Sequence, residues 1–402
     1  MKRRRVKITG IGPVTPAGIG REAFWKGILE PVSRVRPFHG LGKQNGPLVA
    51  AHMDYFDITH FMERGQVPKG AARHTQFALA GAILALQDAG ISKEEFGAAN
   101  STIVTGSTLF DFGGIGRAIE AVYQHGHRGA KGRVVYTTNT ASVPGAINEV
   151  LGVTSDTMTL QSSCASGFDA IGYAAERIAS GHANIALCGG ADAPLHRFPL
   201  LELRAAGLTP PTEEMPERLA RPFDMWRTTG VVSEGSCIFV LESDDSPRPG
   251  YSFISGYAFA NDEPDDLCGG LVASSARAMA EARLRPTEIE VVSAWGPGHR
   301  LIDAGEARAM KGVFRSKLPE IPFVSIKGSI GSPLGAAGPM QVAAAALGQR
   351  HGVIPPTVNW DDPDPACPLN LSHRERLVSH EISLINTHGL AGVNSSMIIE
   401  RC

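Results

Sequence analysis

The amino-acid sequence predicts an α/β fold built in layers, and three observations lead to this prediction. Segments with the short apolar runs of buried strands alternate with segments of helical spacing along most of the chain. The polar segment 244–250, punctuated by Pro and Gly, separates two apolar stretches and is the best boundary. With 402 residues, 43% of them apolar, the chain can bury a large core, and its 46 glycines indicate tight turns and close packing.

The first half of the chain alternates between strand and helix up to the boundary segment. Strands are expected over 6–12, 102–106, 157–160 and 185–188, and helices over 22–29, 70–89 and 165–180. Residues 36–68 read as irregular. Gly181 is expected to close the third helix, and Gly189 with Gly190 to end the fourth strand.

The second half repeats the same alternation. Strands are expected over 291–294, 323–325, 382–386 and 395–399, and helices over 304–314 and 338–348. No short-period repeat is visible in the sequence.

Charge, hydropathy and cysteine usage exclude several classes of protein. The formal net charge of −2 argues against nucleic acid and anionic membranes as partners. No apolar run reaches the roughly 20 residues of a spanning helix, and residues 6–12 are too short and Gly-punctuated for a signal peptide. The six cysteines form no CxxC pair, so no metal site is expected, and a reducing, cytoplasmic setting is the simplest interpretation.

Residues 162–167 (SSCASG) have the pattern of a nucleophile elbow centred on Cys164. They lie between a predicted strand and a predicted helix of small residues. Such a turn exposes its central side chain, and the helix N-terminus stabilises a thiolate. A structural, buried cysteine remains the alternative interpretation of this pattern alone.

Motifs along the whole chain resemble those of the β-ketoacyl–acyl-carrier-protein synthase family. Residues 160–172 (LQSSCASGFDAIG) resemble the family's active-site segment, Cys-Ala-Ser-Gly. The other motifs follow in the family's order: residues 6–18, 188–192 (CGGAD), 221–224 (RPFD) with 233–235 (SEG), Asp303 with Glu306, Lys327 with 335–338 (GAAG), 354–359 (IPPTVN) and 389–394.

This resemblance implies the thiolase fold, with five α-β-α-β-α layers in two pseudo-symmetric halves, residues 1–245 and 250–402. It implies that Cys164 accepts an acyl group as a thioester from the pantetheine of an acyl carrier protein. The implied setting is fatty-acid-like or polyketide-like biosynthesis. The implied assembly is a homodimer, or a heterodimer with a paralogous ketosynthase. No metal or diffusible organic cofactor is implied, because the pantetheine belongs to the carrier protein.

The resemblance also assigns roles around Cys164. The backbone N–H groups of Cys164 and Leu390 would form an oxyanion hole. Lys327 and Glu306 would form a buried pair behind Cys164, in which the lysine lowers the pKa of the thiol; a pair that only holds the sheet end is the alternative. The basic segment 69–73 would meet an acidic carrier protein, with a solvated helix start as the alternative.

The chain departs from the family pattern at both active-site histidines. In the family, these histidines stabilise the enolate formed when malonyl carrier protein loses carbon dioxide, and one lost donor costs roughly 2.7–4 kcal/mol of barrier. Trp295 stands at the first position and Ser332 at the second. Each can donate one hydrogen bond, but neither can be cationic. Trp295 as a pocket-filling aromatic is the alternative to Trp295 as a donor.

Three further positions near the site differ from the family pattern. Pro297 and His299 stand where the family has two threonines that hold the pantetheine arm, and Leu390 replaces the phenylalanine that gates the acyl pocket. His299 and His388 are candidates to replace the lost imidazoles. The alternatives are a surface histidine for His299 and a packed one for His388.

Three functions therefore remain open from the sequence. The first is an acyltransferase that loads Cys164, with decarboxylative condensation impaired or redirected. The second is a non-catalytic partner that shapes the acyl pocket of an active ketosynthase, in the manner of a chain-length factor. The third is a working condensing enzyme in which other groups replace the lost donors.

Overall fold

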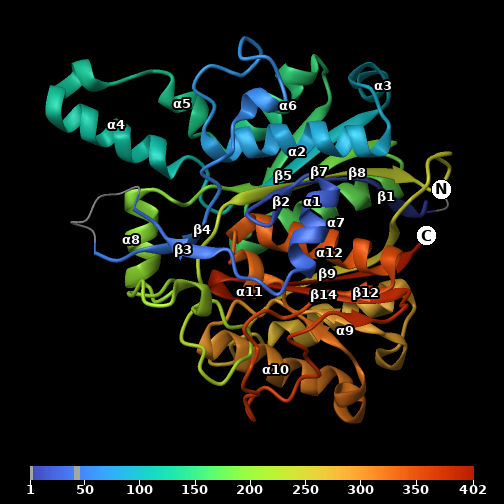
Figure 1. Cartoon of the computed structure of the whole chain (residues 1–402). Coiled ribbons are helices and arrows are strands. Elements are labelled where there is room, and N and C mark those ends of the chain that lie inside the picture. Colours follow the sequence, from blue (N-terminus) through green and yellow to red (C-terminus); the bar gives the residue numbers. More distant parts are fainter. Residues whose placement is uncertain (1–2, 40–45) are drawn as a thin grey trace.

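Five layers make up the fold, in the order helices, sheet, helices, sheet, helices (Figure 1). The computed structural model describes residues 3–39 and 46–402. Residues 1–2 and 40–45 of the predicted half 1–245 lie outside the described residues. The prediction of a five-layered α/β fold is confirmed.

The first sheet has the strand order β6-β5-β7-β8-β1. β5 is parallel to both of its neighbours, and β8 is antiparallel to both of its neighbours. The strands are β1 (Val6–Thr15), β5 (Ser101–Gly106), β6 (Asp156–Leu160), β7 (Ile185–Asp192) and β8 (Gly235–Ser243), with β2 (Gly18–Ile19) paired to the end of β1.

The second sheet has the strand order β11-β10-β14-β15-β9. β10 is parallel to both neighbours and β15 is antiparallel to both, which is the pattern of the first sheet. The two halves are therefore pseudo-symmetric, as predicted. The strands are β9 (Ser252–Asn261), β10 (Val291–Ser293), β11 (Phe323–Val324), β14 (Ile382–Gly389) and β15 (Val393–Arg401).

One short contact makes the two sheets continuous. Val6 and Lys7 of β1 pair with Ile254 and Phe253 of β9, in antiparallel register. The segment 244–250 lies between β8 and β9, where the chain passes from the first half to the second.

Helices form the other three layers (Figure 1). α2 packs on β1 and β8, α9 packs on β9 and β15, and α7 and α12 pack together between the sheets. The outer layers contain α2 (Arg73–Ala89), α3 (Lys93–Ala98) and α6 (Ser142–Leu151) on one side, and α9 (Gly270–Ala282) and α10 (Arg300–Phe314) on the other. The middle layer contains α1 (Arg21–Leu29), α7 (Ser166–Ala179), α11 (Lys327–Ile330) and α12 (Ala337–His351).

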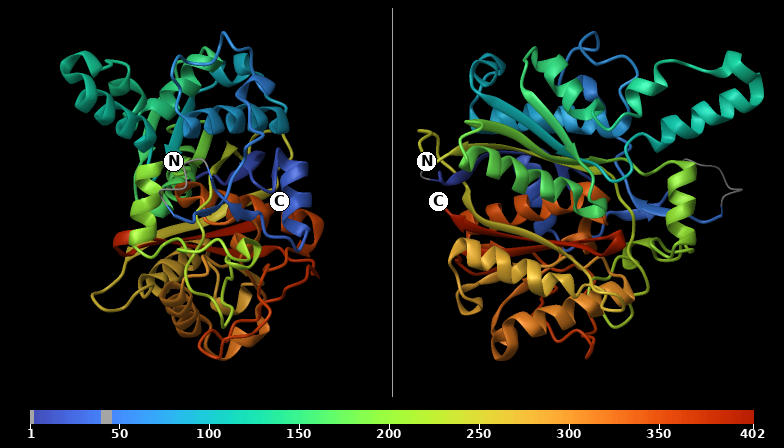
Figure 2. Two further views of the ribbon diagram at one scale, coloured as in Figure 1. Left: turned by 60° about the vertical axis from the view of Figure 1, so that its left-hand side comes forward. Right: turned by 180° about the vertical axis from the view of Figure 1, so that it is seen from behind.

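An arm projects from the layered body (Figure 2). It consists of α4 (Phe112–His125) and α5 (Val134–Thr137), with α8 (Arg197–Ala205) packed at its base. The short strands outside the large sheet are β3 (Val35–Pro37), β4 (Val49–Ala51), β12 (Val353–Ile354) and β13 (Arg376–Leu377). The 3₁₀ helices are η2 (Ile58–His60), η3 (Gly126–Gly129), η4 (Ser163–Ala165), η5 (Pro216–Arg218), η6 (Pro286–Glu288), η7 (Arg315–Glu320), η8 (Leu334–Ala336) and η9 (Leu390–Gly392).

Several element boundaries differ from the predictions. β7 continues through Gly189 and Gly190 to Asp192, because both glycines pair with β8. α10 begins at Arg300, not at 304, because His299 caps its first turn. The region predicted to be irregular contains the β3–β4 hairpin, and its residues 40–45 lie outside the described residues.

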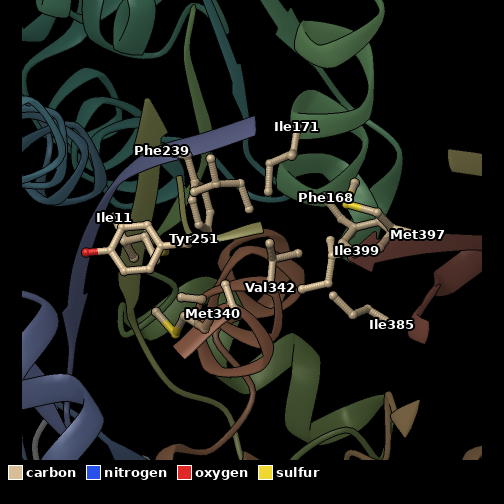
Figure 3. Close-up of a cluster of buried hydrophobic side chains, with 14 of the residues drawn as sticks. Ile11, Phe168, Ile171, Phe239, Tyr251, Met340, Val342, Ile385, Met397 and Ile399 are labelled. Carbon is tan, nitrogen blue, oxygen red and sulfur yellow. The ribbon is translucent and has the colours of Figure 1, made fainter. Parts of the chain in front are cut away.

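The largest hydrophobic cluster joins both sheets through the middle helices (Figure 3). α7 and α12 contribute side chains to it from opposite sides of the middle layer. Its members include Ile11, Phe168, Ile171, Phe239, Met340, Val342, Ile385, Met397 and Ile399, each 1% exposed or less. The two halves therefore share one core.

Three glycines allow backbone atoms of the two halves to touch at the start of α7. A Cβ on Gly167 of α7 would lie 2.3 Å from the carbonyl oxygen of Gly335 in η8. A Cβ on Gly190 of β7 would lie 2.4 Å from the same oxygen. No side chain fits between these three segments, so their glycines set how closely the halves approach.

Gly167→Ala is expected to lower the free energy of unfolding by about 1–3 kcal/mol, because the new methyl group overlaps backbone that cannot move aside. Gly145→Ala is the matched control, since Gly145 lies in α6 and a Cβ there meets nothing within 4 Å. The control should gain about 0.5–1 kcal/mol from the better helix propensity of alanine. Urea unfolding measures both; equal effects would contradict the proposed overlap.

His74 near the start of α2 is buried without a partner for its Nε2 atom among the described residues. Burial lowers the pKa of its imidazole to about 4, so the folded protein holds it neutral. In the unfolded chain, the imidazole of His74 has a pKa near 6.5. Between these values the unfolded state carries the extra proton, so the contribution of His74 to stability is lost as the pH falls.

His74→Leu is expected to reduce the loss of stability between pH 7 and pH 5 by about 2 kcal/mol, because the buried group that resists protonation is gone. Urea unfolding at the two pH values measures this difference directly. The exposed His60→Leu serves as the control and should leave it unchanged. An unaltered pH dependence in His74→Leu would show that other groups cause the acid sensitivity.

Candidate active site

Cys164 lies in a strained turn between β6 and α7. β6 ends at Leu160, and the backbone of Ser163 takes a positive φ of 56°, a conformation that non-glycine residues rarely adopt. Cys164 follows in η4, directly before α7, and is 8% exposed. The carbonyl oxygen of Ser163 accepts hydrogen bonds from Thr108 and Ser166, which hold the turn. The predicted elbow is therefore present, but its side chain is more buried than expected.

The burial of Cys164 opposes ionisation. Burial raises the pKa of the Cys164 thiol to about 11, and the charge of Asp192 acts in the same direction. The Ser163 hydroxyl, the Leu390 backbone N–H and the charge of Lys327 lower this pKa without offsetting the burial. Desolvation therefore outweighs these groups, and the stabilising effect expected of the helix N-terminus stays a prediction.

The two predicted oxyanion donors come from adjacent segments. The backbone N–H of Leu390 in η9 faces the Cys164 sulfur. A Cβ on Gly389 would lie 3.2 Å from the backbone nitrogen of Cys164, so the end of β14 rests against the elbow. The Leu390 side chain is 46% exposed, and the next residue, Ala391, has a positive φ of 66°. The Leu390 N–H, from the second half of the chain, thus faces the sulfur of Cys164 in the first half.

Lys327 and Glu306 lie on two sides of the same peptide. Lys327 Nζ donates to the carbonyl oxygen of Trp295 at 2.6 Å. Glu306 accepts from the backbone N–H groups of Trp295 and Gly296 at 2.8 and 2.9 Å. All three of Lys327, Glu306 and Trp295 are at most 3% exposed.

Lys327 and Glu306, expected as a buried pair, are both buried. No ion pair joins them among the described residues, because the Trp295 peptide lies between them. Burial lowers the pKa of the Lys327 ammonium and raises that of the Glu306 carboxyl, although each charge favours the other. The two groups clamp the turn that carries Trp295.

Trp295 presents its ring to the lysine. Lys327 Nζ lies 3.9 Å from the ring centroid, a cation–π contact. Trp295 belongs to the same buried apolar cluster as Cys164, together with Phe223 and Leu334. The side chain therefore has a packing role beside the nucleophile, while its indole N–H makes no hydrogen bond with another described residue.

Ser332 is fixed through its backbone. Its N–H donates to the carbonyl oxygen of Val231 at 2.7 Å, and its carbonyl oxygen accepts from the N–H of Ser233 at 3.0 Å. Its side chain is partly exposed, and its hydroxyl has no hydrogen-bond partner among the described residues. The hydroxymethyl side chain of Ser332 therefore stands at the position of the second family histidine, on backbone fixed by an isolated β-bridge.

His299 is engaged at the start of α10. Its Nδ1 accepts a hydrogen bond from the backbone N–H of Ile302 at 3.4 Å, which caps the helix. Partial burial and the charge of Arg227 lower the pKa of its imidazole, which agrees with a neutral acceptor. Pro297 in the same turn is buried.

His388 faces away from the nucleophile. Thr387 points to the middle layer, because a Cβ on Gly338 of α12 would meet its Cγ2 atom. Successive side chains of a strand point to opposite faces, so His388 points away from the middle layer. There, His388 Nδ1 lies 3.0 Å from Asn394 Oδ1, and Asn394 donates to Asp262. The structure therefore places neither His299 nor His388 against Cys164.

The basic segment 69–73 is divided between surface and core. Lys69 is exposed. Arg73, in contrast, donates to the buried Glu234 and to the carbonyl oxygen of Met53, and its guanidinium stacks on Phe77. Arg73 therefore contributes to the fold, but its side chain is still 42% exposed, so contact of this segment with a carrier protein stays a prediction.

Two polar residues that the sequence did not single out lie in the site. Asp192 at the end of β7 accepts from Ser107, Thr108, Leu109 and Gly335, and so ties both halves together beside the elbow. Gln341 of α12 accepts from Lys327 Nζ at 2.9 Å. A buried polar residue one turn after the glycine motif 335–338 was the available signal for Gln341.

The described residues contain no cluster of histidine, cysteine and carboxylate side chains that would hold a metal ion. All six cysteines are free thiols, and Cys402 is the exposed one. No helix in the part of the chain that the structure describes has the length and apolar character needed to cross a membrane.

A cysteine at a helix N-terminus, between two pseudo-symmetric halves of a five-layered fold, defines a thiolase-like protein. The family descriptions "Beta-ketoacyl synthase, N-terminal domain" and "Beta-ketoacyl synthase, C-terminal domain" match residues 3–246 and 251–361. The chain belongs to the β-ketoacyl synthase family.

Curated relatives come from polyketide and fatty-acid synthesis. The chain is 30% identical to the tetracenomycin polyketide synthase ketoacyl synthase alpha subunit of Streptomyces glaucescens, over 99% of this chain and 97% of the relative. It is 28% identical to 3-oxoacyl-[acyl-carrier-protein] synthase 2 of Vibrio harveyi, over 100% and 99%.

Solved structures of ketosynthases superimpose over the whole chain. The ishigamide ketosynthase/chain length factor gives a TM-score of 0.92 at 28% identity, covering 100% of both chains. A type II polyketide ketosynthase in complex with its acyl-carrier protein, also covering 100% of both chains, gives 0.89 at 24% identity, which supports the fold alone.

Glu306→Ala is expected to lower the free energy of unfolding by about 2–4 kcal/mol, because two buried N–H groups lose their acceptor. Glu306→Gln should lower the free energy of unfolding by less, since the remaining side-chain oxygen can still accept a hydrogen bond. Exposed Glu320→Ala is the control and should cost under about 1 kcal/mol. Urea unfolding of the three variants measures these losses of stability. A similar loss in all three would show that Glu306 does not hold the Trp295 turn.

Proposed function

We propose that this protein is a β-ketoacyl synthase-type acyltransferase that accepts an acyl chain from an acyl carrier protein on Cys164. Decarboxylative condensation is impaired or redirected in this proposal, and the setting is fatty-acid-like or polyketide-like biosynthesis. The observation that carries it is the direction of the Leu390 backbone N–H toward the Cys164 sulfur, just before the start of α7.

The proposed transfer exchanges one thioester for another. The Cys164 sulfur attacks the carbonyl carbon of the acyl–pantetheine thioester, and the carbon–sulfur bond to pantetheine breaks. The proton of the Cys164 thiol ends on the departing pantetheine sulfur, so charge and atoms balance. The N–H groups of Cys164 and Leu390 support the negative oxygen of the tetrahedral intermediate.

The groups around the sulfur supply the field for this step. The charge of Lys327 stabilises the thiolate, and the burial of Cys164 strengthens that interaction because water is excluded. Glu306 holds the Trp295 turn in place beside it. These residues support acyl loading without any histidine.

The second half of the family reaction lacks its donors in this chain. Trp295 and Ser332 stand at the histidine positions, and neither side chain can carry a positive charge. His299 and His388 are bound elsewhere, to Ile302 and Asn394. Impaired or redirected condensation follows, since two missing donors would raise the barrier by several kcal/mol.

The proposed partners are an acyl carrier protein, which brings the pantetheine, and a second chain. β6 pairs on one edge only among the described residues, so its other edge is open to a partner strand. The arm carries exposed apolar side chains, with Tyr123 91% and Tyr136 78% exposed. Both features support a homodimer, or a heterodimer with a paralogous ketosynthase.

A non-catalytic, chain-length-factor-like partner is the second candidate function. The loss of both histidines and the buried, weakly acidic Cys164 favour it. The retained elbow, with its positive φ at Ser163 and its backbone donor at Leu390, favours the acyltransferase. A working condensing enzyme is the third candidate, and it requires Trp295, Ser332 or another group to stabilise the enolate.

Intact-protein mass spectrometry with acyl carrier protein of varied acyl chains, followed by malonyl carrier protein, separates these functions. We expect an acyl adduct that Cys164→Ala abolishes and that exposed Cys402→Ala retains, without consumption of malonyl groups. The control removes a thiol that is far more accessible than Cys164.

The remaining outcomes identify the alternatives. Absence of any adduct on the unmodified protein would favour the non-catalytic partner. An adduct followed by an extended ketoacyl product would show a working condensing enzyme.

A further inference from the structure

A surface pocket of about 490 Å³ lies outside the site around Cys164. Its walls come from three segments: the last turns of α8, residues 207–211 and residues 228–229. Three threonines, Thr209, Thr228 and Thr229, contribute to these walls, so we call it the threonine pocket. Its volume is in the range of pockets that bind small ligands.

The threonine pocket is electrostatically positive. The described residues that line it include no carboxylate and a single charged side chain, Arg204. The guanidinium of Arg204 donates to the carbonyl oxygen of Pro47 at 3.1 Å, which holds it at the wall. Arg227, next to Thr228 in the sequence, is paired instead with Asp364 and does not line the pocket.

A buried hydroxyl inside the threonine pocket makes no hydrogen bond with another described residue. Thr209 lines the pocket and is only 2% exposed, and its Oγ1 atom is buried. The hydroxyl of Thr229, in contrast, donates to the carbonyl oxygen of Gly207. Because a buried hydroxyl without a partner costs free energy, the Thr209 hydroxyl indicates that the pocket holds a polar ligand.

The threonine pocket is connected to the candidate active site through two helices. The carbonyl oxygen of Thr228 accepts from the backbone N–H of Arg300 at 3.4 Å, at the start of α10. Leu200 and Leu203 of α8 belong to the same buried apolar cluster as Cys164. α8 therefore contacts both the threonine pocket and the cluster that surrounds the nucleophile.

A guanidinium and hydroxyl groups without a nearby carboxylate suit a phosphate. Arginine presents its N–H donors in a planar fork that matches phosphate oxygens, and hydrogen bonds to a charged oxygen are stronger than those between neutral groups. An apolar ligand would leave the hydroxyl of Thr209 without a partner, and a cation would be repelled by Arg204.

We propose that the threonine pocket binds the phosphate of the pantetheine arm of the acyl carrier protein, with charge from Arg204 and a hydrogen bond from Thr209. This proposal rests on the proposed function, because an acyl group that arrives on a carrier protein arrives on a phosphorylated arm. It adds a second subsite, outside the reacting centre, that recognises the arm and not the acyl chain.

The test compares two small acyl donors, acyl-phosphopantetheine and acyl-pantetheine, which differ only in the phosphate. Intact-protein mass spectrometry measures how fast each loads Cys164 at a concentration below saturation. The phosphorylated donor should load about tenfold faster, the effect of adding a charge-assisted hydrogen bond in binding. Arg204→Gln and Thr209→Val should each reduce this preference by about threefold to tenfold and leave loading from acyl-pantetheine unchanged.

Thr105→Val is the matched control for Thr209→Val. Thr105 in β5 is also 2% exposed, and its Oγ1 likewise makes no hydrogen bond among the described residues, but it does not line the pocket. Arg197→Gln is the control for Arg204→Gln, because Arg197 is an exposed arginine of the same helix. Both controls should keep the preference for the phosphorylated donor. Equal donor rates in the unmodified protein, or equal effects of the two threonine variants, would overturn the proposal.

Thermal unfolding with the free compounds separates this proposal from the proposed function. Phosphopantetheine should raise Tm more than pantetheine does, and Thr209→Val should remove the difference even if Arg204→Gln does not fold. Absent loading with this difference retained would remove the proposed function alone, and loading with neither preference nor difference would remove this proposal alone. An equal rise in Tm with the same concentration of inorganic phosphate would show a site for free phosphate and overturn the assignment to the arm.

Discussion

At the start of α7, backbone atoms from the two halves of the chain meet with no side chains between them. Gly167, Gly190 and Gly335 make this approach possible, and Asp192 reinforces it by accepting the N–H of Gly335 together with those of Thr108 and Leu109. The carbonyl oxygen of Gly335 would overlap a Cβ on Gly167 or Gly190, so a side chain at either position would push the two halves apart. The position of Cys164, three residues before Gly167, depends on this contact.

The candidate site gathers where strands of both sheets end. Cys164 follows β6, Trp295 follows β10, Lys327 follows β11 and Leu390 follows β14. In layered α/β proteins, functional groups collect at the carboxyl ends of parallel strands, because the loops there are free of the sheet. The pseudo-symmetry of the two sheets brings loops from both halves to one place, so one half supplies the nucleophile and the other the surrounding charges.

Burial decides the electrostatics of that place. Cys164, Lys327 and Glu306 all have pKa values moved toward the neutral form by desolvation. Around Cys164, the groups that oppose this effect are few: a hydroxyl, a backbone N–H and one ammonium that only neutral atoms contact. In such a site each remaining charge has a large effect, since little water screens it. Under the proposed function, the replacement of two imidazoles by Trp295 and Ser332 would remove most of the means of stabilising an enolate, while acyl loading would retain its donors.

The sequence by itself determined the layered α/β class, the strand–turn–helix around Cys164 and the absence of both family histidines, since local patterns and ordered motifs carry these. It misjudged β7, because the glycines that would end an isolated strand are needed where another backbone approaches. It did not foresee the peptide that lies between Lys327 and Glu306, or how strongly burial opposes the ionisation of Cys164. Only the tertiary structure decided these, because they depend on how deeply each group is buried and on what lies between them.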